Sequence, residues 1–163
     1  MGHTGMTDVL AGIKAYLVTG GVFETEITAI ETAKSITITS PQEIVFIESV
    51  SRQYPTIEFT PANGRASYAD DQGAGAHGMD LHYVDMTAYH SSNDRSTVRD
   101  TLLYYDLALA MAIEADLTFG SRFNRVRRGE VDYSDLMQYA EAKTFLQIMR
   151  RRLEIRTTFE ERS

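Results

Sequence analysis

The chain has 163 residues, no Cys and no Trp, and its 16 Lys and Arg against 23 Asp and Glu give a net charge of −7. Without cysteine, disulfides, thiolate metal sites and Cys nucleophiles are excluded, and the acidic balance argues against a general nucleic-acid-binding protein. No apolar run approaches the roughly 18 residues of a membrane span, and the first seven residues contain no signal-peptide core. We therefore expect a soluble, intracellular protein that forms a single domain over residues 1–163 and does not contact a membrane.

The first 60 residues predict one helix followed by strands. Apolar residues from Val9 to Leu17 recur at helical spacing after the capping residue Thr7, and a Gly-Gly pair at 20–21 ends the helix. Residues 22–50 are ambiguous, because 23–35 fits a strand or a helix whereas 36–39 and 44–47 fit short strands. We interpret 22–50 as an inserted, hairpin-like segment, which is followed by an alternating strand over 56–60.

Residues 61–79 predict a long flexible loop. A loop of this length inside a compact domain is usually functional, and we expect it to act as an arm that contacts a neighbouring subunit. Its candidate contact residues are Asp70, Asp71, Gly73, Gly75 and Gly78. The run 73–78 also matches G-x-G-x-x-G, but a dinucleotide site needs that run between a strand and a helix, and here it leads into a strand. We therefore expect no nucleotide.

An alternating strand over 80–90 and the longest helix of the chain come next. Alternation places His82, Val84, Met86, Ala88 and His90 on one face of the strand. Thr97 is the predicted cap of a helix that runs to about Asp116, and Asp100 supports this cap. The apolar stripe of this helix consists of Val98, Leu102, Tyr105, Leu109, Ala112 and Ile113.

The remaining residues predict more strands. We expect a strand over 123–127, a turn at Arg128-Gly129, and a short helix or turn over 133–139. Residues 136–149 fit a helix or a strand, whereas from Arg152 onward Leu153, Ile155, Thr157 and Phe159 alternate with polar residues in a clear strand. The whole order predicts an α+β fold, with a mostly antiparallel β-sheet, helices packed on one face, the long loop and the hairpin-like insertion.

Basic and acidic side chains are unevenly distributed. Residues 1–121 hold 6 basic and 16 acidic side chains, whereas residues 122–163 hold 10 and 7, so a body of charge −10 precedes a tail of +3. Two groups of arginines dominate the tail: Arg122, Arg125, Arg127 and Arg128, then Arg150, Arg151, Arg152 and Arg156. This asymmetry favours surfaces that face different partners, although a solvated strand face crossed by salt bridges would have the same composition.

Patterns typical of enzymes and metal sites are missing from the sequence. His82 and His90 share a strand face but lie eight residues apart, about 26 Å along a strand, which is too far to ligate one metal ion. The chain has no nucleophile elbow, Walker loop, H-E-x-x-H or EF-hand spacing. We therefore expect no cofactor, no metal ion and no enzymatic activity.

The order and character of the elements resemble those of phage tail terminators, the small neck proteins that end a long tail tube. The resemblance covers about residues 52–160 and rests on Tyr54–Phe59, Leu81–Met86, Thr101–Ala110 and Arg152–Arg156. It implies a structural ring, usually a hexamer, which lies in the virion between the tail tube protein and the head–tail connector. Such a ring is assembled in the host cytoplasm, and genomic DNA passes through its lumen without specific binding. Residues 22–50 depart from the family pattern.

Under this resemblance, the loop residues and the arginines are candidate subunit or partner contacts. The arginines in question are Arg125, Arg127, Arg128, Arg150, Arg151, Arg152 and Arg156. We expect them to pair with the acidic region 1–121 of a neighbouring subunit, because subunits of a ring meet through two different surfaces. Three alternatives remain open: a head-completion or connector adaptor, a small nucleic-acid-binding module that uses the arginines, and an enzyme that uses the Gly-rich loop.

Overall fold

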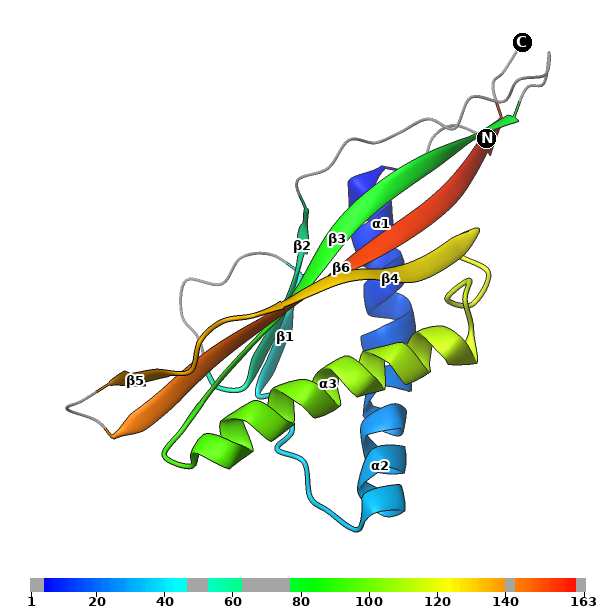
Figure 1. Ribbon diagram of the computed structural model, residues 1–163. Coiled ribbons are helices and arrows are strands. Elements are labelled where there is room, and N and C mark those ends of the chain that lie inside the picture. Colours follow the sequence, from blue (N-terminus) through cyan, green and yellow to red (C-terminus); the bar gives the residue numbers. More distant parts are fainter. Residues whose placement is uncertain (1–4, 47–52, 63–76, 140–142, 161–163) are drawn as a thin grey trace.

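A computed structural model describes residues 5–46, 53–62, 77–139 and 143–160 of the chain, and the structural statements below refer to these residues. Helices cover one face of a six-stranded sheet (Figure 1). The helices are α1 (Met6–Lys14), its π-helical continuation η1 (Ala15–Thr19), α2 (Val22–Lys34) and α3 (Arg95–Ala115). The strands are β1 (Glu43–Val45), β2 (Thr56–Pro61), β3 (His77–Ser92), β4 (Arg125–Tyr133), β5 (Met137–Tyr139) and β6 (Thr144–Glu160).

The sheet has the strand order β1-β2-β3-β6-β4, and β5 pairs with the beginning of β6. β1 runs parallel to β2, whereas the other pairings are antiparallel. β3 and β6 pair along their whole length, from His77 opposite Glu160 to Ser92 opposite Phe145, and they form the long central ribbon in Figure 1. The predicted α+β class with a mostly antiparallel sheet is therefore confirmed.

The two faces of the sheet differ as strand alternation predicts. On the face toward the helices, Val84, Met86 and Ala88 of β3 lie beside Leu153 and Met149 of β6, and all of them are buried. Apolar side chains on one face of a strand are removed from water together when a helix covers that face. This inner face and the buried sides of the three α-helices form one hydrophobic core.

Helix α3 begins earlier than expected. Asp94 is its N-cap, because the Asp94 carboxylate accepts hydrogen bonds from the backbone N–H of Ser96 at 3.0 Å and from the hydroxyl of Thr97 at 3.0 Å. The predicted cap at Thr97 is wrong, since Thr97 lies in the first turn and donates to the true cap. The predicted apolar stripe is confirmed, because Val98, Leu102, Tyr105, Leu109, Ala112 and Ile113 are all buried.

The N-terminal segment contains two helices where one was expected. Gly5, rather than Thr7, precedes α1, and the predicted hairpin at 22–50 is wrong because residues 22–34 form α2. Phe23, Ile27 and Ile30 are buried at helical spacing against α3. No single helix among the described residues is long and apolar enough to cross a membrane, although the bent pair Met6–Thr19 and Val22–Lys34 satisfies length and composition together.

Residues 36–39 were expected to form a strand, but they run extended without strand pairing. Their polar groups bond to side chains instead: the N–H of Ile38 donates to the carboxylate of Glu31 at 3.0 Å, and the hydroxyl of Tyr105 donates to the carbonyl of Thr39. The expected strand at 44–47 is present as the short β1 over 43–45, while residue 47 lies outside the described part.

Three predictions in the C-terminal half also need correction. β3 begins at His77, so the last residues of the predicted loop belong to a strand. β4 runs through the predicted turn at Arg128-Gly129, because a bulge between Arg128 and Val131 absorbs the irregularity. Residues 133–139, predicted as a short helix or turn, are the end of β4, a connection over 134–136 and the strand β5. The described residues of the ambiguous segment 136–149 belong mainly to β5 and β6.

Candidate functional site

The register of β6 with its neighbours separates the candidate arginines onto the two faces of the sheet. Arg151 lies between Met86 and Val131 on the inner face, toward the helices, and the inward-facing Arg128 lies opposite Leu153. The other five candidates belong to the outer face, which is the face away from the helices: Arg125, Arg127, Arg150, Arg152 and Arg156. The two sequence groups therefore do not form one surface.

Arg151 is held by a buried ion pair with helix α3. Its Nε lies 2.8 Å from Oδ1 of Asp106 and its Nη2 lies 2.6 Å from Oδ2, while its Nη1 donates to the carbonyl of Gly129 at 2.8 Å. The two side chains are 13% and 11% exposed. The hydrogen bonds from Arg151 to Asp106 raise the pKa of Arg151. Arg151 therefore stabilises the fold, and its charge is not available to a partner.

Arg128 joins the same cluster more loosely. Its Nη1 lies 3.7 Å from Oδ2 of Asp106, and its side chain is 36% exposed. Arg151 also donates to the carbonyl of Gly129, which lies in the bulge of β4. Both Arg151 and Arg128 therefore contact the carboxylate of Asp106. This cluster fixes α3 to β4 and β6 and leaves one edge of Arg128 open to solvent.

On the outer face, two arginines have partial partners within the chain. Arg152 lies 3.4 Å from the carboxylate of Asp85, and its guanidinium lies 5.5 Å from the ring centre of Tyr83. Arg127 approaches Glu154 only to 4.0 Å, and half of its side chain is exposed. The Arg127–Glu154 pair contributes little to stability because it is exposed, so Arg127 remains accessible to a second anion.

The other three arginines of the outer face have no ion pair among the described residues. Arg125 on β4 lies directly opposite Arg156 on β6, and Arg150 is exposed farther along the same strand. Like charges directly opposite each other on neighbouring strands destabilise a sheet. Arg125 and Arg156 therefore repel each other in the isolated chain, and an anionic group from outside the chain would relieve that repulsion. We call Arg125, Arg150 and Arg156 the unpaired arginines.

The predicted loop contacts fall largely outside the described residues. Asp70, Asp71, Gly73 and Gly75 lie in the segment 63–76, of which the structure describes nothing. Gly78 belongs to β3, where it pairs with Phe159 of β6. The G-x-G-x-x-G run therefore ends inside a strand, and the strand-to-helix setting of a dinucleotide site does not follow it.

The exposed apolar residues of α3 were not predicted from the sequence. Leu103 and Leu107 are 44% and 39% exposed, whereas Leu102, Tyr105 and Leu109 of the same helix are buried. The signal was present in the sequence, since Leu103 and Leu107 lie outside the predicted apolar stripe, one turn apart. The buried Asp106 between them was also missed, and its position in an otherwise apolar stretch would have indicated a buried cation partner.

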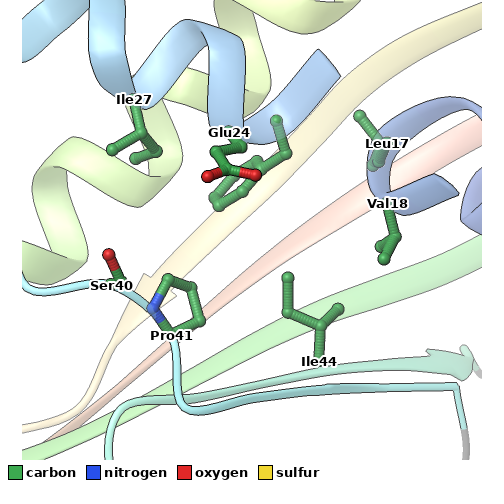
Figure 2. Close-up of a pocket in the computed structure, with 8 residues that line it drawn as sticks. Leu17, Val18, Glu24, Ile27, Ser40, Pro41 and Ile44 are labelled. Carbon is green, nitrogen blue, oxygen red and sulfur yellow. The ribbon is translucent and has the colours of Figure 1, made fainter. Parts of the chain in front are cut away.

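Among the described residues, small hollows open on the helical side. One, of about 220 Å³, separates the end of η1 and the start of α2 from residues 40–44, and Figure 2 shows Glu24 as the carboxylate at its wall. Another, of about 200 Å³, lies between residues 36–39 and the first turns of α3. No group of three potential metal ligands occurs among the described residues.

Comparisons with known proteins add one finding. No protein-family model matches the chain, and no curated protein matches its sequence. A chain of the virion of a native gene transfer agent particle is similar in structure. The TM-score is 0.36 and the sequence identity is 12%, over 86% of this chain and 98% of that chain.

Proposed function

We propose that the chain is a structural virion protein of the phage neck, which forms a ring, usually a hexamer in such proteins, that ends the tail tube and joins it to the head connector. The observation that carries this proposal is the arginine-rich outer face, whose unpaired arginines lie on the side of the sheet away from the helices. A chain that leaves opposed cations unpaired has a surface suited to an anionic partner, and an acidic second copy supplies one.

The rest of the molecule supports an assembly role in two ways. The α+β architecture is the one that the resemblance to tail terminators implies. The charge balance also suits self-association, since residues 1–121 carry a net charge of −10 and the C-terminal part carries +3. A mainly acidic ring also has little affinity for the phosphates of DNA that passes through it. The proposed role requires no catalysis.

The proposal is tested by adding the purified protein to its cognate tail tube protein during polymerisation. We expect tubes to stop elongating and negative-stain images to show a ring at the tube end. Heat-denatured protein at the same concentration is the control for non-specific inhibition. Tubes of unchanged length with bare ends would contradict the role as terminator.

The related adaptor role differs in its partner. A head-completion or connector adaptor would bind the isolated head–tail connector and leave tube elongation unchanged. The same experiment with the connector immobilised separates the two roles, because a terminator that joins tube and head binds both.

Nucleic-acid binding is a second candidate, and the unpaired arginines favour it as well. Contacts between arginines and phosphates predict an affinity for duplex DNA that falls steeply with salt. Fluorescence anisotropy with labelled duplex in low and high salt measures this directly. Absence of binding at low salt removes the candidate.

A further inference from the structure

We infer that the outer face of β4 and β6 docks onto the exposed side of α3 of a second copy of this chain, in a head-to-tail contact. This inference rests on the proposed ring and names the two surfaces that close it. The first surface consists of the unpaired arginines Arg125, Arg150 and Arg156. The second consists of Leu103, Leu107 and Glu114.

The described residues supply no carboxylate partner for the unpaired arginines. In the register of β4 and β6, Glu154 lies opposite Arg127 and Asp132 lies opposite Arg150 on the outer face. Glu154 approaches Arg127 to 4.0 Å and Asp85 of β3 approaches Arg152 to 3.4 Å, whereas Arg150 makes no ion pair with any described residue although Asp132 lies opposite it. Between the charges the face also offers apolar area, since Tyr83 and Ile148 are only partly buried. A partner for this surface therefore needs both anionic and apolar side chains.

The exposed side of α3 has these two properties. At 100° per residue, Leu103, Leu107 and Glu114 fall within an arc of about 40° and extend for about 16 Å along the helix. Leu103 and Leu107 are each more than a third exposed. Glu114 is exposed, and it has no ion pair among the residues that the structure describes. The leucines suit the partly buried apolar side chains of the sheet, and the carboxylate suits the arginines.

The position of Glu114 strengthens this reading. It lies in the last turn of α3, where no basic residue is present. The C-terminal end of a helix carries partial negative charge, so a carboxylate there is unfavourable in the isolated chain and a cation is favourable. A cation from a second copy would interact with Glu114 and with the helix end at once. Arg125 and Arg156, which lie opposite each other without an ion pair among the described residues, could supply this cation.

The two surfaces belong to opposite faces of the sheet, which determines the symmetry of the contact. Helix α3 covers the inner face, whereas the unpaired arginines belong to the outer face, so one chain cannot pair them with each other (Figure 1). A two-fold contact between outer faces would bring arginines against arginines and is disfavoured. The remaining arrangement is heterologous, with the sheet of one copy on the helix of the next, and such contacts form a ring when the rotation between copies closes.

The test uses two variants, each of which has lost one surface. Arg125→Glu with Arg156→Glu reverses the sheet surface, and Leu107→Lys with Glu114→Lys reverses the helix surface. Lys14→Glu with Lys34→Glu, at two exposed positions on α1 and α2, is the control with the same change of charge as the sheet variant. Circular dichroism and thermal melting verify that each variant folds.

We expect mass photometry to show assembly of the wild type and the control, and a loss of association of at least about tenfold in either surface variant alone. Mixed in equal amounts, the two surface variants should associate again, because the unaltered sheet of the helix variant can dock onto the unaltered helix of the sheet variant. Mixed variants that stay monomeric while the wild type assembles would overturn the inference and leave the ring standing.

Two other outcomes would also overturn the inference. A wild type that remains monomeric under all conditions overturns the inference together with the proposed function. A sheet variant that assembles like the wild type but loses binding to duplex DNA at low salt shows that the arginines serve nucleic acid, and it overturns the inference alone.

Discussion

The ion pair between Asp106 and Arg151 is the contact whose loss should affect the fold most clearly. Substitution Asp106→Ala removes both carboxylate acceptors and leaves the guanidinium of Arg151 13% exposed beneath α3. The remaining hydrogen bond, to the carbonyl of Gly129, does not neutralise the charge. We expect Asp106→Ala to destabilise the fold strongly without disturbing the outer face of the sheet.

The magnitude follows from the burial of the two groups. Removing one partner of a fully buried pair costs about 3–5 kcal/mol, and the residual exposure of 11% and 13% places this pair near the lower end, at about 3 kcal/mol. For a chain of this length, that loss lowers the melting temperature by about 6–12 °C. The matched control on the same helix is Asp100→Ala, because Asp100 pairs with Arg99 at 3.3 Å with side chains 63% and 47% exposed. Such a surface pair contributes less than about 1 kcal/mol.

Urea denaturation followed by circular dichroism measures the loss of stability in both variants. All samples are compared at one protein concentration, because assembly adds to the apparent stability. A double-mutant cycle with Arg151→Met isolates the pair, and we expect a coupling energy of about 2 kcal/mol. If Asp106→Ala costs no more than Asp100→Ala, or if the coupling is near zero, Arg151 is not a structural residue. Its charge would then be available to a partner after all.

Three further predictions concern the core and the caps. His90 is 4% exposed, and burial lowers its pKa. The unfolded chain, in which the histidine pKa is near 6.5, therefore binds a proton at higher pH than the folded chain does. The free energy of unfolding should consequently fall as the pH drops below about 6.5. His90→Leu should flatten that loss in urea titrations between pH 7 and 5, and an unchanged slope would contradict the assignment. Asp94→Ala should lower the melting temperature by a few degrees and Thr97→Ala by less, because Asp94 accepts both hydrogen bonds of the cap; the reverse order would place the cap at Thr97. Gly12→Ala should destabilise by about 1–3 kcal/mol, since the new Cβ would lie 2.5 Å from the ring of Phe123, whereas the same change in an open helix stabilises.

Strands with one covered face were predictable from alternation alone. The inward set of β3 from His82 to His90 and the inward Leu153 and Ile155 of β6 lie as expected. The same alternation places Arg152 and Arg156 outward and Arg151 inward, so most of the division of the arginines was already implied. What alternation does not reveal is the partner of an inward charge, because Asp106 lies 45 residues away in the sequence.

Segments with β-branched residues or irregular pairing were not predictable in this way. Helix α2 contains threonines that favour strands, but the hydroxyls of Thr25 and Thr32 bond back to carbonyls four residues earlier, at 2.9 and 3.0 Å. The bulge after Arg128 lets β4 continue where a Gly predicted a turn. In both places tertiary packing overrides the local preference of the residues.

The candidate site was predictable in composition but not in geometry. The sequence shows a basic tail after an acidic body, and it therefore indicates two charged surfaces. Only the strand register shows that Arg125 and Arg156 lie opposite each other. The exposure of Leu103 and Leu107 was indicated by their position outside the apolar stripe of the helix, and the structure gives its extent. These relations depend on strand pairing and helix packing, which join residues far apart in the chain.

We propose that this chain assembles with itself into a closed structural ring. The most direct measurement is mass photometry of the purified wild type across a range of protein and salt concentrations. We expect one closed species whose subunit number stays constant as the protein concentration rises, and which dissociates as salt screens the arginine contacts. A monomer at every concentration in low salt, or an open series of oligomers that grows with concentration, would contradict it.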